Sequence, residues 1–412
     1  MAATFIVRYR NGQEIADVAS IAFDKRIKKR LNRISECTFR VPSYMVNEIV
    51  DDGYPLLSAG NRQLSVTLDS VGLFFHGLVW NIQEEGDEDM VYSRVTCYDP
   101  LMLWHYRPAR DLVDSYSGDA GNLSDPSFLA RNLTGPQSME EILLASENPA
   151  LIPAEAEGPL FLDLATSTYA TGGSDLSGAP VNWPMTIAEI ATLLTNTGEC
   201  DIIFEPIVET AVDLSNMGRV HCFNGDYGTD LSGTVHFDFA TGDYNARLYR
   251  RSEDMSTIGN KIFYYLGQRL DQQHWRSNVT RDHPGFASIP SFPALSDMID
   301  DSRDRYGVYM LNNIYDNFGT ESSAYPLFLR QFMVESLIRL GPRKMVYITP
   351  IRNGEFGPGD FDVGDLITVN IGSKARVTES GVQRIYGYTI DIDDDAVEAL
   401  GEFETSPDQD AL

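Results

Sequence analysis

Two histidines and the polar side chains between them are the first residues in the sequence that could bind a metal ion. His221 and His236 flank Asn224, Asp226 and Asp230. Imidazole nitrogens and carboxylate oxygens are common metal ligands, but metal-binding histidines usually lie a few positions apart on one helix or hairpin. Because these two are fifteen positions apart, we interpret them as polar residues on strand faces and predict no metal site here.

A second possible ligand set is the run Asp391-Ile392-Asp393-Asp394-Asp395. Its carboxylates are the hard oxygen donors that calcium prefers. The run lacks the glycine turn and the distal glutamate of a calcium-binding loop, so we interpret it as the solvated end of a strand. We therefore predict no metal ligand in the chain.

The sequence contains none of the short motifs that position a catalytic side chain or a phosphate. There is no Gly-x-Ser-x-Gly, no Gly-Lys-Ser/Thr phosphate loop and no His-Glu-x-x-His. The 60 acidic residues make chance pairs of carboxylates inevitable, so such pairs do not indicate a glycosidase. We predict that the chain is not an enzyme and uses no cofactor.

One strongly basic segment stands out in an acidic chain. Residues 25–33 hold six cations, whereas the whole chain has 32 basic and 60 acidic residues and a formal net charge of −28. These cations could contact DNA, but the overall negative charge favours docking on an acidic surface of another protein. The predicted interface residues are Lys25, Arg26, Lys28, Lys29, Arg30 and Arg33.

Composition argues against several classes of protein. The acidic excess repels DNA phosphates and anionic lipid, although a negative wall suits a conduit through which DNA only passes. The four cysteines have no Cys-x-x-Cys spacing, so we expect isolated buried thiols in place of a zinc site or a disulfide framework. We find no membrane-length apolar run and no secretion signal, and expect a cytosolic product that leaves the cell only within an assembled particle.

The N-terminal part of the sequence predicts a small β-barrel or sandwich over residues 1–106. Short runs rich in β-branched and aromatic residues alternate there with turn signals. The predicted strands are Thr4–Arg10, Cys37–Val41, Gln63–Ser70, Gly72–Ile82 and Met90–Tyr98. Asp99 followed by Pro100 predicts a helix N-terminus that closes this unit.

The remaining chain divides by composition into four parts. Residues 107–184 predict a loop-rich insertion with one short helix at Ser138-Met139-Glu140-Glu141, and residues 185–343 predict an α+β domain with helices after Thr186 and from Pro326. Residues 344–396 predict a second barrel-like segment, and residues 397–412 an acidic, partly disordered tail. The predicted fold class is β-rich α+β, with two small β-barrel-like domains and an inserted or adjacent α+β domain.

A succession of short motifs resembles a known family. The motifs are Phe39-Arg40-Val41-Pro42, Gly60-Asn61-Arg62, Phe75-His76-Gly77-Leu78-Val79, Cys97-Tyr98-Asp99, residues 260–267, Asp304-Arg305-Tyr306-Gly307, and residues 363–367 with 387–390. Over roughly residues 3–395 this order resembles the minor tail proteins, or tail-tip hubs, of siphophages that infect actinobacteria. These proteins are similar in turn to the central hub of contractile phage baseplates. Residues 107–184 match no part of that pattern.

The resemblance implies a structural virion protein at the tail tip, with no catalytic residue. It implies a homotrimer whose six barrels adapt the sixfold tail tube to a threefold tip and form part of the DNA channel. The implied partners are the distal tail protein ring, the C-terminus of the tape measure protein and other minor tail proteins, with no membrane and with genome DNA only in transit. Two alternatives stay open: a carbohydrate-binding tail adhesin and a polysaccharide hydrolase.

Overall fold

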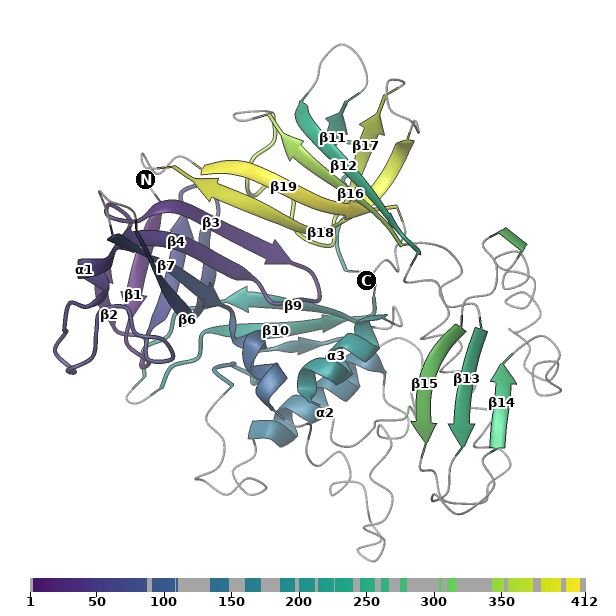
Figure 1. The fold of residues 1–412 in the computed structure, drawn as a ribbon, viewed down its shortest axis with the longest axis horizontal. Helices are drawn as coiled ribbons and strands as arrows, with labels where there is room; N and C mark the ends of the chain where they lie inside the picture. The colour runs from purple at the N-terminus through teal and green to yellow at the C-terminus, as the bar shows by residue number, and fades with distance from the viewer. Residues whose placement is uncertain are drawn as a thin grey trace, which may run out of the picture.

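The computed structural model describes residues 3–86, 91–107, 109, 134–147, 160–171, 186–196, 200–211, 214–225, 227–239, 245–255, 261–266, 275–279, 304–305, 310–316, 343–351, 355–372, 379–393 and 398–407. Strands dominate these residues, and most of them pair antiparallel (Figure 1). The predicted β-rich fold class is confirmed. One large sheet of 13 described strands runs through the chain, beside two sheets of 3 strands each.

The N-terminal half of the large sheet curls into a barrel-like unit. Its strands are β1 (Thr4–Arg8), β2 (Glu14–Asp17), β3 (Phe23–Arg30), β4 (Glu36–Pro42), β5 (Gln63–Leu68), β6 (Gly72–Gly86) and β7 (Val91–Tyr98), in the spatial order β3-β4-β7-β6-β5-β1-β2. The alternating burial of β4 places Cys37, Phe39 and Val41 in the core. Phe5 of β1 meets Phe39 edge-on at 5.8 Å between ring centroids, so the sheet curls until these two strands face each other across the core.

The C-terminal half forms a second barrel-like unit. Its strands are β11 (His236–Asp238), β12 (Ala246–Asp254), β16 (Arg343–Pro350), β17 (Leu366–Ile371), β18 (Glu379–Ile392) and β19 (Glu398–Ser406). Strand pairing runs β12-β16-β19-β18-β17-β11. Asn245, just before β12, donates to the His236 carbonyl at 2.7 Å and thereby returns the chain to β11. This half is therefore also curled back on itself.

The two halves are not separate barrels, because β3 pairs with β18. The register runs from Lys25 opposite Ile392 to Arg30 opposite Gly387 and makes one continuous sheet of both units. Local patterns gave no signal of this pairing. The independent barrels expected from the sequence are thus joined through the strand that carries the basic segment.

A small α/β unit packs beside the large sheet (Figure 1). It contains the 3₁₀ helix η1 (Pro100–Tyr106), α2 (Gly135–Glu147), β8 (Thr168–Tyr169), α3 (Ile187–Asn196), β9 (Asp201–Pro206) and β10 (Gly218–Phe223). Side chains from all six elements share one apolar core. The boundary predicted at 184/185 is therefore wrong, since α2 and β8 of the expected loop-rich insertion belong with α3, β9 and β10. The boundary at 343/344 is wrong as well, because β11 and β12 complete the C-terminal half.

The predicted helix caps have mixed outcomes. Asp99 accepts from the Leu101 amide at 3.1 Å, and the Thr186–Glu189 capping box forms with both reciprocal bonds, so these two predictions are confirmed. The start predicted at Ser138 is wrong. Helix α2 begins at Gly135, where the Gln137 side chain accepts from the Thr134 amide at 3.0 Å, so one half of a Thr-x-x-Gln capping box lies one turn earlier.

The expected acidic tail is wrong for residues 398–406. They form β19, which pairs with both β16 and β18, and Phe403 is fully buried. The Phe403 ring contacts Phe361 and Phe237 at 4.9 and 5.1 Å between centroids. Alternating acids on one face and buried residues on the other give this segment its strand period, which overall acidity obscured.

Four further elements complete the described part of the fold. Strands β13 (Lys261–Leu266), β14 (Trp275–Val279) and β15 (Met310–Asp316) form the third sheet. Helix α1 (Ser43–Val46) follows β4. The helix predicted from Pro326 lies outside the described residues. No helix in the described part of the chain is long and apolar enough to cross a membrane.

The four cysteines are buried free thiols, as predicted, but they are not isolated. Cys37 and Cys97 are direct cross-strand partners on β4 and β7. Burial, followed by the charge of Cys97 and then Glu36, raises the pKa of the Cys37 thiol well above its ordinary value. These side chains fill the core as small apolar groups.

Candidate interaction groove

The basic segment forms β3, the strand that joins the two halves of the large sheet. Successive side chains on a strand point to opposite faces, so its six cations are divided between two environments. Lys25 is buried and donates to the Ala19 carbonyl at 3.1 Å. Arg26 is exposed, Lys28, Lys29 and Arg30 are half-buried, and Arg33 is exposed in the turn after the strand.

Three of these cations pair with carboxylates of the C-terminal half. Arg26 meets Asp391 at 2.6 Å and Lys29 meets Asp362 at 2.6 Å. Lys28 pairs with Glu404 of β19. The acidic surface that the basic segment contacts in the structure is thus this chain's own C-terminal half. Docking of the segment on another protein stays a prediction, now confined to the side chains that also face solvent.

A charge swap tests this seam between the halves. Lys28→Glu would place a second carboxylate beside Glu404. The Lys28 and Glu404 side chains are 22% and 16% exposed, so this pair is less buried than an ion pair in the core. We expect the free energy of unfolding to fall by about 1–2 kcal/mol, between the values for exposed and buried ion pairs. The double variant Lys28→Glu/Glu404→Lys should regain most of that loss in urea unfolding. A double variant no more stable than the single one would show that the pair does not hold the halves together.

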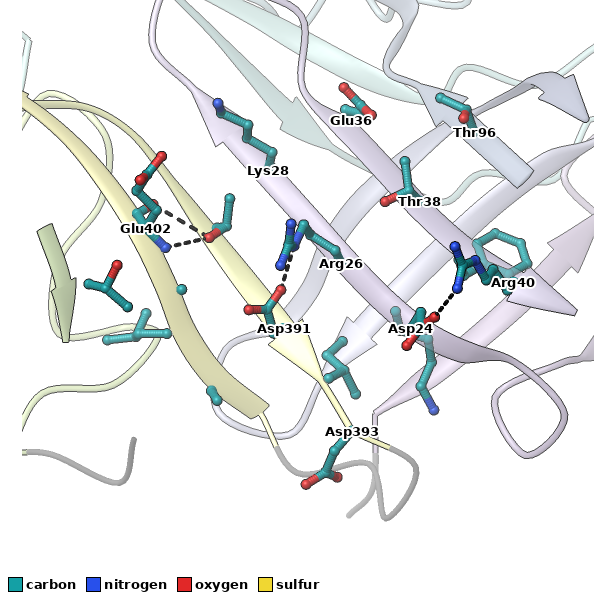
Figure 2. Close-up of a pocket in the computed structure, with 18 of the residues that line it drawn as sticks. Asp24, Arg26, Lys28, Glu36, Thr38, Arg40, Thr96, Asp391, Asp393 and Glu402 are labelled. Atoms are coloured by element: carbon teal, nitrogen blue, oxygen red, sulfur yellow. Dashed lines mark hydrogen bonds and ion pairs between the residues drawn. The ribbon is translucent and has the colours of Figure 1, made fainter. Parts of the chain in front are cut away.

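The outer face of the joined sheet is hollowed into a groove of about 1130 Å³. Strands β7, β4, β3, β18 and β19 form its floor, with Arg247 of β12 and Thr349 of β16 at one side. Figure 2 shows Arg26 directed at Asp391 and Arg40 at Asp24, within a row of polar side chains. Six Lys or Arg and five Asp or Glu line it, which makes the groove nearly neutral in a chain of charge −28.

Strands β18 and β19 approach closely at Gly401, which lines the groove. A Cβ at this position would lie 2.1 Å from the Thr389 hydroxyl oxygen, so no larger residue fits without a shift. The same hydroxyl accepts from the Glu402 amide at 2.7 Å. A polar hollow whose positive and negative charges nearly balance suits a protein segment better than a nucleic acid.

A buried charge cluster, missed from the sequence, locks the three parts of the fold together. Arg384 of β18 and Asp201 of β9 form an ion pair of 2.5 Å, with side chains only 5% and 3% exposed. Asp201 also accepts from the Asn32 side chain at 2.9 Å, and Asn32 directly follows the basic strand. Arg384 donates in addition to the Tyr227 carbonyl at 2.7 Å. The one available signal was a single arginine in an otherwise apolar stretch of strand.

The candidate metal residues do not come together. His221 lies on β10 of the α/β unit and contacts Glu205 at 2.8 Å, whereas His236 lies on β11 of the large sheet. Asp226 is outside the described residues. Among the residues that the structure describes, no group of three His, Cys, Asp or Glu side chains could hold a metal ion. Of the acidic run, Asp391 is the partner of Arg26 and Asp393 lines the groove.

Aromatic side chains bear on the adhesin alternative. Trp104 is buried, as packing beside a helix start requires. Trp80 is half-buried and lies 5.6 Å from Tyr106, which is 63% exposed. This pair is the kind of partly exposed aromatic surface on which a sugar ring can stack, and the sequence gave no sign of it.

No protein-family model and no curated protein matches the sequence. Among solved structures, the 43 kDa tail protein of prophage MuSo2 from Shewanella oneidensis matches with a TM-score of 0.53 at 11% identity, over 99% of both chains. The chain therefore has the fold of a phage tail protein along nearly its whole described length. The predicted resemblance to phage tail proteins is confirmed at the level of fold.

Two further likenesses are weaker. A tail protein from Neisseria meningitidis MC58 gives a TM-score of 0.47 at 12% identity, over 100% of this chain and 99% of that one. The prophage tail protein gp18 from Listeria monocytogenes EGD-e gives 0.46 at 9% identity, over 98% and 95%.

Proposed function

We propose that the chain is a structural component of a phage tail and forms the hub at the tail tip. The observation that carries the proposal is the pairing of β3 with β18, which fixes two barrel-like units in one sheet, in a chain whose fold matches a phage tail protein from end to end. Three copies would then present six barrel-like units, the number needed to meet a sixfold tail tube.

The charge of the chain fits a conduit. Three copies at −28 each carry a formal charge of −84. Phosphates passing a wall of that sign are repelled and make no long-lived contacts. DNA is thus a passenger and not a ligand. The proposed lasting partners are the distal tail protein ring, the C-terminus of the tape measure protein and other minor tail proteins. We propose no catalytic role.

Location in the particle is directly testable. Gold-labelled antibody raised against the purified chain, imaged on intact phage particles, is expected to mark the end of the tail that is distant from the capsid. Label distributed along the tube, or particles that contain the tail yet bind no antibody after mild opening of the tip, would contradict the proposed place.

A carbohydrate-binding adhesin is the second candidate, and the Trp80–Tyr106 pair favours it. Stacking of a sugar on this surface would change the fluorescence of Trp80. Titration of the chain with host cell-wall glycan distinguishes the two functions. Saturable quenching that Tyr106→Ala removes would support the adhesin. An unchanged spectrum would exclude the adhesin and leave the hub as the proposed function.

A further inference from the structure

The connection between β4 and β5 is an ordered hairpin, which we call the 43–57 hairpin. Its base is anchored in the N-terminal core by Val46, Leu56 and Leu57. The Leu56 amide donates to the Glu48 carbonyl at 2.7 Å, and the Val50 amide to the Tyr54 carbonyl at 3.1 Å. Ser43 in addition contacts Ser93 of β7 at 2.9 Å between hydroxyl oxygens. The segment is thus held by its own backbone and by the core below it.

A buried arginine fixes the tip of this hairpin. Arg62 is 1% exposed and binds both carboxylate oxygens of Asp52 at 2.7 Å. It also donates to the carbonyls of Pro55 and Tyr54 at 3.1 and 3.3 Å. The hydrogen bonds from Arg62 hold the pKa of the Asp52 carboxyl below its ordinary value. The guanidinium fork therefore sets the tip in one conformation before any partner arrives.

The hairpin holds apolar side chains out in solvent. Tyr44 is 74% exposed, Ile49 62% and Tyr54 52%, and they are among the most exposed large hydrophobic residues in the described part of the chain. Three such side chains within eleven positions form a patch, whereas single exposed apolar residues are ordinary. A rigid patch of this kind loses little entropy on binding, which is typical of a docking element.

Charge indicates what the hairpin binds. Residues 43–61 carry three acids and no Lys or Arg. In a chain of charge −28, an acidic hairpin can approach another copy only where cations offset the repulsion. The groove is such a place, since its six Lys or Arg balance its five Asp or Glu, and Ile392 and Leu400 line it as well.

We propose that the 43–57 hairpin of one copy docks in the groove of a second copy of this chain. The inference rests on the proposed hub and names the contact that would assemble it. Hairpin and groove are different surfaces, so the contact is heterologous, and repeating it generates a ring when the rotation between copies closes, and not a twofold dimer. Tyr44, Ile49 and Tyr54 fill the hollow, while the hairpin acids face the groove arginines.

The test compares the wild-type chain with Ile49→Asp by light scattering and analytical ultracentrifugation. Ile49 is exposed, so the variant should fold as the wild type does, with an unchanged circular dichroism spectrum and unfolding curve. We expect it to weaken assembly at least about 30-fold, as loss of a central contact residue does. Val382→Asp is the matched control, because Val382 is 48% exposed and lies outside the groove and the hairpin. It should assemble normally.

Mixing two defective variants tests the pairing itself. Arg94→Glu should damage the groove and leave the hairpin intact, whereas Ile49→Asp does the reverse. An equal mixture then contains one sound hairpin and one sound groove, and we expect a 1:1 pair that neither variant forms alone. Wild-type rings that Ile49→Asp does not disturb, or a mixture that stays monomeric, would overturn the hairpin contact and leave the hub standing. A wild-type chain that forms no ring would overturn both.

Discussion

Asp201→Ala is expected to lower the free energy of unfolding by about 3–5 kcal/mol, because it leaves Arg384 charged and buried without its partner. The change also removes the acceptor of the Asn32 side chain, so the basic strand, the α/β unit and the C-terminal half lose their common anchor. Urea unfolding followed by tryptophan fluorescence measures the effect.

Two comparisons make that result specific. Asp391→Ala removes the carboxylate that pairs with Arg26, where the two side chains are 43% and 60% exposed, and should cost no more than about 1 kcal/mol. Asp201→Leu/Arg384→Met replaces the buried pair by apolar groups and should be more stable than either single variant. Equal losses for Asp201→Ala and Asp391→Ala would refute the anchoring role.

A fall in pH is expected to lower the free energy of unfolding by about 3 kcal/mol through His76, the second large effect. Burial lowers the pKa of His76 from 6.5 to about 4, against the raising effect of the Ile207 carbonyl. Between pH 6.5 and pH 4 the unfolded chain therefore binds a proton at His76 that the folded chain does not bind. Stability from this residue is complete above pH 6.5 and is lost as the pH falls toward 4, at about 1.4 kcal/mol per pKa unit.

His76→Gln isolates this contribution. Glutamine keeps a polar group near the Ile207 carbonyl, which accepts from His76 at 2.5 Å, and does not titrate. Burial raises the pKa of Asp99 to about 7, which acts in the opposite direction, so the variant must be compared with the wild type at each pH. The difference between them should shrink from pH 7 to pH 4.5. Parallel curves for His76→Gln and the wild type would contradict the assignment.

Local patterns located five strands of the N-terminal unit and two of the helix starts. Period-2 alternation is enough to place β4 or β17, and the Thr186–Glu189 box is enough to begin α3, because both depend on residues a few positions apart. They failed at β3. There Lys25 is buried and Lys29 is half-buried on the same face as Ile27, so the inward face carries charged residues and the alternation of apolar and polar residues is lost.

What the sequence could not show depends on contacts between distant segments. Arg26 and Asp391 are 365 positions apart, and nothing local relates them. The same holds for Asp201 and Arg384, which are 183 positions apart and belong to the α/β unit and to the C-terminal half. The groove depends on such a pairing, that of β3 with β18. The basic segment was correctly identified as unusual, but its neighbours are set by topology, which periodicity does not encode.

The most direct test of the hub is the mass of the purified chain in solution together with a low-resolution electron microscope image of the same sample. The proposed arrangement predicts particles of three copies with threefold symmetry and a central opening. Monomers that stay single at high concentration and show no annulus, alone or mixed with the tail-tube protein, would contradict it.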